Sequence, residues 1–138
     1  MVDWYQTLLG MTVGLEPLVT AVVHPVDVTA LSGAVSAANA KLIIPILVGP
    51  EDRIKNAAKE GNIDLSGFKI INTRHSGESV ETAIDLIKSG KAEAIMKGEI
   101  HTDELMEYIV KKESGLRTAR RMSHVFAAQL ATYNKLLL

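Results

Sequence analysis

Two stretches near the end of the sequence gather side chains that can bind phosphate groups. They cover residues 96–106 and 115–126, and each joins the end of a predicted strand or helix to a cluster of basic and hydroxyl groups. An Arg fork or a Lys ammonium binds oxyanions through charge-assisted hydrogen bonds. We therefore predict that a phosphate-bearing ligand is bound by Lys97, His101, Thr102, Arg117, Arg120, Arg121, Ser123 and His124.

Composition narrows the class of protein that could present these residues. The 138 residues are 47% hydrophobic, which indicates one folded domain rather than disorder. A net charge of −1 provides no global field to recruit nucleic acid or an anionic membrane, although residues 111–121 hold five basic residues and one acid. No cysteine is present, so disulfides and thiolate chemistry are excluded. The sequence shows no membrane-length apolar run and no signal peptide, and we expect a cytoplasmic protein.

Short apolar runs alternate with segments of helical periodicity, which predicts an α/β fold. The strands should pair as a mostly parallel sheet sandwiched by helices, in a single α/β domain over residues 1–138. Pro45 favours a second strand that properly begins after it. Predicted strands are 19–23, 42–48 (its core 46–48), 69–72, 92–96, 125–128 and 136–138. Predicted helices are 3–11, 27–40, 51–60, 78–89 and 103–113.

Residue types at the helix ends support these boundaries. Asp27 and Thr102 are suited to capping the helices that follow them, because their side-chain oxygens can accept hydrogen bonds from free backbone N–H groups. Gly61 and Gly90 fall just beyond helix ends, where glycine is favoured.

Ligands of open α/β sheets bind outside the carboxyl ends of the strands, and the sequence places polar groups there. His24 and Asp27 follow the first strand, Arg74 and His75 follow the third, and Lys97 begins the turn after the fourth. Each turn leads into a helix N-terminus, which attracts anions. This convergence predicts an anion site at that edge.

Plainer interpretations stay open for each of these groups. Arg74 and His75 could be solvated loop residues, and His101 could pack before its helix without touching a ligand. The three arginines between 117 and 121 could form an ordinary basic surface. The four histidines are scattered without metal-ligand spacing, so we predict no metal site. The glycine-rich patterns of dinucleotide and P-loop sites and the nucleophile elbow of hydrolases are all missing from the sequence.

Taken in order, these motifs resemble the phosphate acetyl/butyryltransferase family. The resemblance runs from about residue 17 to the end. It is carried by His24-Pro25-Val26-Asp27, Pro45–Gly49, Met96-Lys97-Gly98 with His101-Thr102, Gly115-Leu116-Arg117-Thr118 and Arg120–Phe126. It implies reversible transfer of an acyl group from acyl-CoA to inorganic phosphate, without metal or covalent enzyme intermediate. It also implies the first part of an isocitrate/isopropylmalate dehydrogenase-like fold, in a family whose members are usually dimeric. Coenzyme A would be a substrate or product rather than a tightly bound cofactor.

Family members continue beyond the point that corresponds to Leu138, and the later half supplies the Ser, Arg and Asp assigned to catalysis. The resemblance therefore implies an N-terminal portion of a phosphate acyltransferase, weakly active or inactive alone, in which no catalytic residue is assigned. Two alternatives remain: a non-catalytic CoA- or phosphate-binding or assembly module, and one half of a split enzyme. We expect a homo-oligomer or a complementary chain as partner.

Overall fold

The computed structural model describes residues 2–138, which divide into two compact units. Residues 17–117 form the sheet unit, and residues 2–16 with 118–138 form the terminal unit. Among the described residues, no helix has both the length and the apolar character that crossing a bilayer requires.

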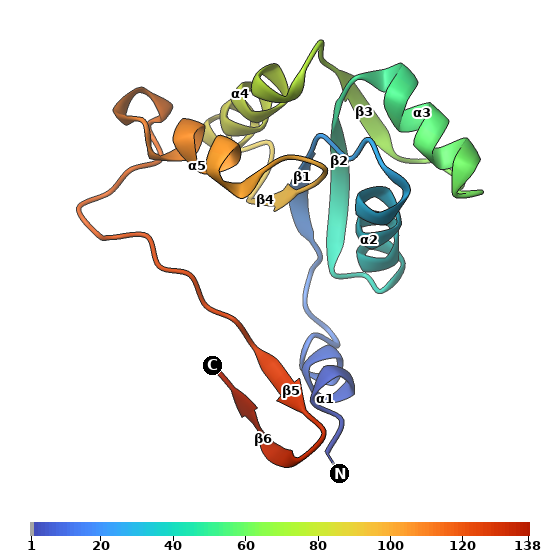
Figure 1. Cartoon of the computed structure of the whole chain (residues 1–138), viewed down its shortest axis with the longest axis vertical. Coiled ribbons are helices and arrows are strands. Elements are labelled where there is room, and N and C mark those ends of the chain that lie inside the picture. The colour runs from blue at the N-terminus through green and yellow to red at the C-terminus, as the bar shows by residue number, and fades with distance from the viewer. Residues whose placement is uncertain (1) are drawn as a thin grey trace. The chain divides into compact units, whose positions relative to one another are not determined.

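The sheet unit is built on a parallel sheet of four strands, and this confirms the predicted α/β class (Figure 1). The strand order is β3-β2-β1-β4, and every neighbouring pair is parallel. The strands are β1 Leu18–Val23, β2 Ile43–Gly49, β3 Lys69–Asn72 and β4 Ala94–Lys97. The helices are α2 Val28–Asn39, α3 Glu51–Glu60, α4 Ser76–Lys88 and α5 Thr102–Val110, followed by the short 3-10 helix η1 Lys112–Ser114.

Helices cover both faces of this sheet, as Figure 1 shows, and the pleat of β1 divides the core between them. Ala21 and Val23 belong to the cluster packed on α4 and α5, whereas Val22 belongs to the cluster packed on α2 and α3. Successive strand residues point to opposite faces, so a continuous apolar run is required when both faces are buried. The two clusters account for most of the fully buried side chains, including Leu31, Leu47, Ile54, Val48 and Val80.

Of the helices α2, α4 and α5, which follow the strands β1, β3 and β4, two begin at residues other than those predicted from the sequence. Asp27 caps α2 as predicted, because its Oδ1 accepts from the Ala30 N–H at 2.8 Å. α4 begins at Ser76 rather than at the predicted residue 78. His75 caps it, because its Nδ1 accepts a hydrogen bond from the Glu78 N–H at 3.2 Å. The prediction that Thr102 caps α5 is wrong. Thr102 is already the first helical residue, and the His101 carbonyl accepts the first helical bond.

Pro45 lies inside β2 rather than before it, because β2 begins at Ile43. The pairing with β3 starts only at Ile46, so at Pro45 the strand has β1 as its one neighbour, opposite Thr20. A missing N–H is tolerated at such an edge-like position.

The terminal unit contains α1 Trp4–Met11, as predicted for residues 3–11, and the two-stranded sheet of β5 Ala128–Leu130 and β6 Tyr133–Leu137. Trp4 joins helix and hairpin: its backbone N–H donates to Gln129 Oε1 at 2.8 Å, and its indole N–H donates to the Asn134 carbonyl at 3.1 Å. The predicted addition of strands 125–128 and 136–138 to the parallel sheet is wrong. β5 and β6 pair with each other in antiparallel fashion, and the two-residue connection between them permits a hairpin but no parallel crossover.

Candidate functional site

A cleft of about 600 Å³ lies at the carboxyl edge of the parallel sheet. The turns after β1 and β4 line it together with the first residues of α2, α4 and α5. This is the edge at which the sequence predicted an anion site. The lining residues are His24, Asp27, Thr29, Ala30, Ser76, Lys97, Gly98, Glu99, Ile100, His101 and Glu104.

Two backbone hydrogen bonds fasten the turn after β4 to the turn after β1. The Gly98 N–H donates to the Val23 carbonyl at 2.8 Å, and the Glu99 N–H donates to the His24 carbonyl at 2.9 Å. A β-carbon at position 98 would lie 2.3 Å from the Val23 oxygen and 2.7 Å from the His24 oxygen, so only glycine fits. His24 itself has a positive φ of 57°, an uncommon conformation for a residue with a side chain. The two turns that line the cleft are therefore held closely against each other.

The Lys97 side chain is held by the turn that follows it. Its ammonium donates to the Ile100 carbonyl at 2.7 Å and to the Gly98 carbonyl at 3.3 Å. Among residues 2–138 it forms no ion pair with a carboxylate. The positive charge is thus positioned in the cleft without being neutralised by an acidic partner.

The N-terminal ends of α2, α4 and α5 converge on the same cleft. Thr29 and Ala30 lie in the first turn of α2, Ser76 opens α4, and His101 immediately precedes α5. Backbone N–H groups in a first helical turn carry partial positive charge and include donors without helical acceptors. Together with Lys97 they make a set of donors suited to an oxyanion.

The cleft also holds carboxylates that sequence reasoning did not assign to it. Glu99 and Glu104 line it beside Asp27, and the Ser76 hydroxyl donates to Glu104 Oε1 at 2.5 Å across the α4–α5 gap. In the sequence Glu104 was simply an acid in a first helical turn, which the helix dipole explains equally well. The site is therefore mixed in charge rather than uniformly cationic.

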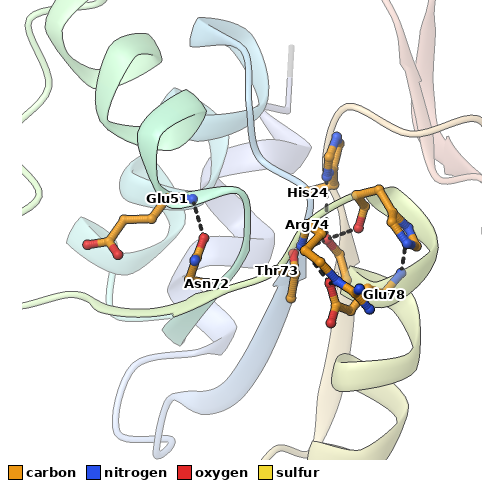
Figure 2. Close-up of polar contacts among 8 residues, drawn as sticks. His24, Glu51, Asn72, Thr73, Arg74 and Glu78 are labelled. Atoms are coloured by element: carbon orange, nitrogen blue, oxygen red, sulfur yellow. Dashed lines mark hydrogen bonds and ion pairs between the residues drawn. The ribbon is translucent and has the colours of Figure 1, made fainter.

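Behind the cleft, a buried polar network surrounds the His24 ring (Figure 2). The Arg53 guanidinium lies 3.4 Å from Nε2, and because it can only donate, Nε2 must be the acceptor. Nδ1 then carries the proton and faces Ser79 Oγ at 3.4 Å. Ser79 Oγ in turn accepts from Thr73 Oγ1 at 2.7 Å and donates to the His75 carbonyl at 2.9 Å.

Burial lowers the pKa of His24 below its ordinary value, and the nearby Arg53 charge lowers it further. His24 is 4% exposed, so its imidazole is neutral in this network. His24 therefore supports the turn after β1 and also lines the cleft.

Arg74 and His75 lie near this network but do not line the cleft. Arg74 donates through its backbone N–H and through Nε to Glu78 Oε2, at 2.6 and 3.1 Å, and its side chain is 82% exposed (Figure 2). His75 caps α4. The structure therefore gives both residues local structural roles.

The remaining predicted ligand residues lie elsewhere. Thr102 and Arg117 belong to the sheet unit and are exposed, but they do not line the cleft. The residues Arg120, Arg121, Ser123 and His124 belong to the terminal unit and are also exposed. The His124 and Phe126 rings have centroids 4.2 Å apart. Ligand binding by these residues stays a prediction.

No group of three or more His, Cys, Asp or Glu side chains among residues 2–138 has an arrangement that could hold a metal ion. Lys97, His24, Asp27 and His101 are the predicted site residues that the structure brings together.

Comparison with known proteins identifies homologues. No family model matches the chain. A phosphate acetyltransferase of Rickettsia prowazekii (strain Madrid E) is 50% identical over 122 residues, which are 88% of this chain and 35% of that protein. A phosphate butyryltransferase of Clostridium acetobutylicum is 35% identical over 92 residues, which are 67% of this chain and 31% of that protein.

The chain is a partial-length homologue of the phosphate acetyltransferases. It spans about a third of the length of the curated relatives that it matches, 35% in the Rickettsia protein. The resemblance drawn from the sequence motifs is confirmed to this extent.

A solved structure supports the fold. A phosphotransacetylase from Streptococcus pyogenes superposes with a TM-score of 0.64 over 78% of this chain and 41% of that one, at 15% sequence identity. At this identity the likeness concerns the fold alone, and it agrees with the parallel sheet and its covering helices.

Replacing Gly98 should destabilise the sheet unit. In Gly98→Ala the new β-carbon would collide with backbone oxygens that cannot move without breaking the β1–β4 pairing. We expect the free energy of unfolding to fall by about 2 kcal/mol or more, measured by urea denaturation. Gly33→Ala is the matched control, because open space surrounds that helical position and the substitution should stabilise by roughly 0.5–1 kcal/mol. Equal stability of Gly98→Ala and the unmodified chain would contradict the steric requirement for glycine at this position.

His24 should make folding stability depend on pH. Its pKa is lower in the folded chain than in the unfolded chain, so the unfolded chain takes up the proton first. The stabilisation is complete above the ordinary value of 6.5 and decreases as pH falls below it toward the folded-state pKa. Urea unfolding between pH 5 and 8 should therefore show a loss of stability toward low pH that His24→Asn reduces. An identical pH profile for His24→Asn would count against the buried neutral imidazole.

Proposed function

We propose that this chain supplies a phosphate-binding part of a phosphate acyltransferase, which converts acyl-CoA and inorganic phosphate reversibly into acyl phosphate and CoA. The observation that carries the proposal is the cleft in which Lys97 and three helix N-termini converge. The names of the homologues, phosphate acetyltransferase and phosphate butyryltransferase, support the same chemistry.

Within this proposal the residues divide into two groups. Lys97 and His101, beside the first turns of α2, α4 and α5, would bind the oxygens of inorganic phosphate. In the sheet unit, Thr102 and Arg117 would bind phosphate groups of CoA, because hydroxyl and guanidinium groups donate to phosphate oxygens. Taken by themselves, the exposed residues Arg120, Arg121, Ser123 and His124 of the terminal unit are candidates for the same chemistry. His24 and Asp27 would shape the cleft, with Arg74 and His75 at its margin. No residue of this chain is assigned a catalytic role.

The same proposal covers the properties that the family resemblance implies. The four-stranded sheet would be the first part of an isocitrate/isopropylmalate dehydrogenase-like fold, and residues 1–138 a portion of a longer acyltransferase. CoA would enter and leave as substrate or product rather than as a tightly bound cofactor. We place the protein in the cytoplasm, as a homo-oligomer or with a complementary chain.

Because the chain spans 35% of its Rickettsia relative, we propose that it turns over acyl-CoA weakly or not at all by itself. The alternative function is a non-catalytic module that binds CoA or phosphate. A phosphate-dependent CoA-release assay separates the two when a polypeptide carrying the rest of such an enzyme is added. Restored turnover supports the acyltransferase portion, whereas binding that never leads to turnover favours the module.

Phosphate binding tests the proposal directly. In isothermal titration with inorganic phosphate, Lys97→Met should weaken binding roughly tenfold, because it removes the ammonium positioned in the cleft. Lys91→Met removes one positive charge from an exposed position outside the cleft and should leave the affinity within about twofold. Equal effects of the two substitutions, or no binding to the unmodified chain, would contradict the proposed site.

A further inference from the structure

We propose that the cleft selects an oxyanion that carries a proton, and that the Glu104 carboxylate accepts a hydrogen bond from this proton. The anion chosen on this basis is inorganic phosphate in preference to sulfate. The inference rests on the proposed function and goes beyond it, because it concerns which anions of equal shape the site accepts.

Glu104 is held in the cleft as an acceptor. The Ser76 hydroxyl donates to its Oε1 at 2.5 Å, which fixes the carboxylate between the first turns of α4 and α5. The other oxygen, Oε2, has no hydrogen-bond or ion-pair partner among residues 2–138. Both Ser76 and Glu104 line the cleft and are half-buried. The acceptor oxygen without a partner therefore belongs to a residue that lines the same cleft as Lys97 and the helix ends.

An ionised carboxylate can only accept hydrogen bonds. Sulfate at neutral pH carries no proton and can only accept hydrogen bonds. A sulfate oxygen beside Glu104 would therefore place two negatively charged oxygens, one from each group, next to each other without a proton between them. Inorganic phosphate retains at least one O–H near neutral pH and can donate it to Oε2, while its other oxygens accept from the cleft donors. Two acceptors that face each other without a proton weaken the binding of sulfate, whereas a charge-assisted hydrogen bond to Glu104 strengthens the binding of phosphate.

The other two carboxylates of the cleft are less suited to this task. Asp27 Oδ1 is already engaged by the Ala30 N–H as the α2 cap. Glu99 is exposed, and its side chain accepts no hydrogen bond from another residue of the described chain. Glu104 alone combines burial with a side-chain partner that fixes its direction. Ser76 is thus a positioning residue for the same selection.

The test compares three tetrahedral anions by isothermal titration at pH 7.5 and constant ionic strength: phosphate, arsenate and sulfate. Arsenate resembles phosphate in shape and also carries a proton. We expect phosphate and arsenate to bind at least about tenfold more tightly than sulfate. Glu104→Gln should reduce that ratio to about twofold, because its amide can donate to sulfate. Asp103→Asn also removes one negative charge from the first turn of α5, but from an exposed position that does not line the cleft, and it should leave the ratio unchanged.

A second variant guards against a purely structural effect. Ser76→Ala keeps the carboxylate but frees it, so the ratio should fall only in part, with urea unfolding confirming that both variants fold. Equal binding of sulfate and phosphate, or an unchanged ratio in Glu104→Gln, overturns the selection and leaves the proposed function standing. Failure of the unmodified chain to bind any of the three anions overturns both.

Discussion

The candidate site depends on the pair of backbone hydrogen bonds that join the turn after β1 to the turn after β4. Gly98 donates to Val23 and Glu99 donates to His24, across segments that are far apart in the sequence. These bonds extend the β1–β4 ladder, whose last pair is Val23 with Lys97, past the end of the strands. They hold the turn that follows Lys97, and with it the start of α5, against the turn after β1. A glycine at position 98 is the steric condition for this approach.

Around that junction the cleft combines groups of opposite charge. Lys97 and the helix ends provide donors, whereas Asp27, Glu99 and Glu104 provide acceptors. A uniformly basic cleft would bind any polyanion, because attraction between opposite charges is not selective. In the proposed selection, Glu104 discriminates between anions by the position of a proton, because among residues 2–138 it is the one cleft carboxylate held by a side-chain hydrogen bond.

Much of the sheet unit follows from local sequence. Helical periodicity placed Val80, Ala83 and Ile84 on the buried face of α4, and the rule that ligands bind at carboxyl strand ends pointed to the edge where the cleft lies. These rules do not predict which side chains contact each other when the residues are far apart in the sequence. Neither the Ser76–Glu104 hydrogen bond nor the burial of His24 has a local signal, because each depends on how α4 packs beside α5 and β1. The terminal strands were misplaced because apolar residues favour a strand without specifying its partner.

The claim that three helix N-termini and Lys97 form one phosphate site is tested most directly by NMR titration of the labelled chain. Added phosphate should shift the backbone amide signals of Thr29, Ser76 and His101, which line the cleft, together and with one common dissociation constant, while the amides of residues 58–65 stay unchanged. Shifts confined to one of these helices, or different dissociation constants for the three, would show that the elements do not act as a single site.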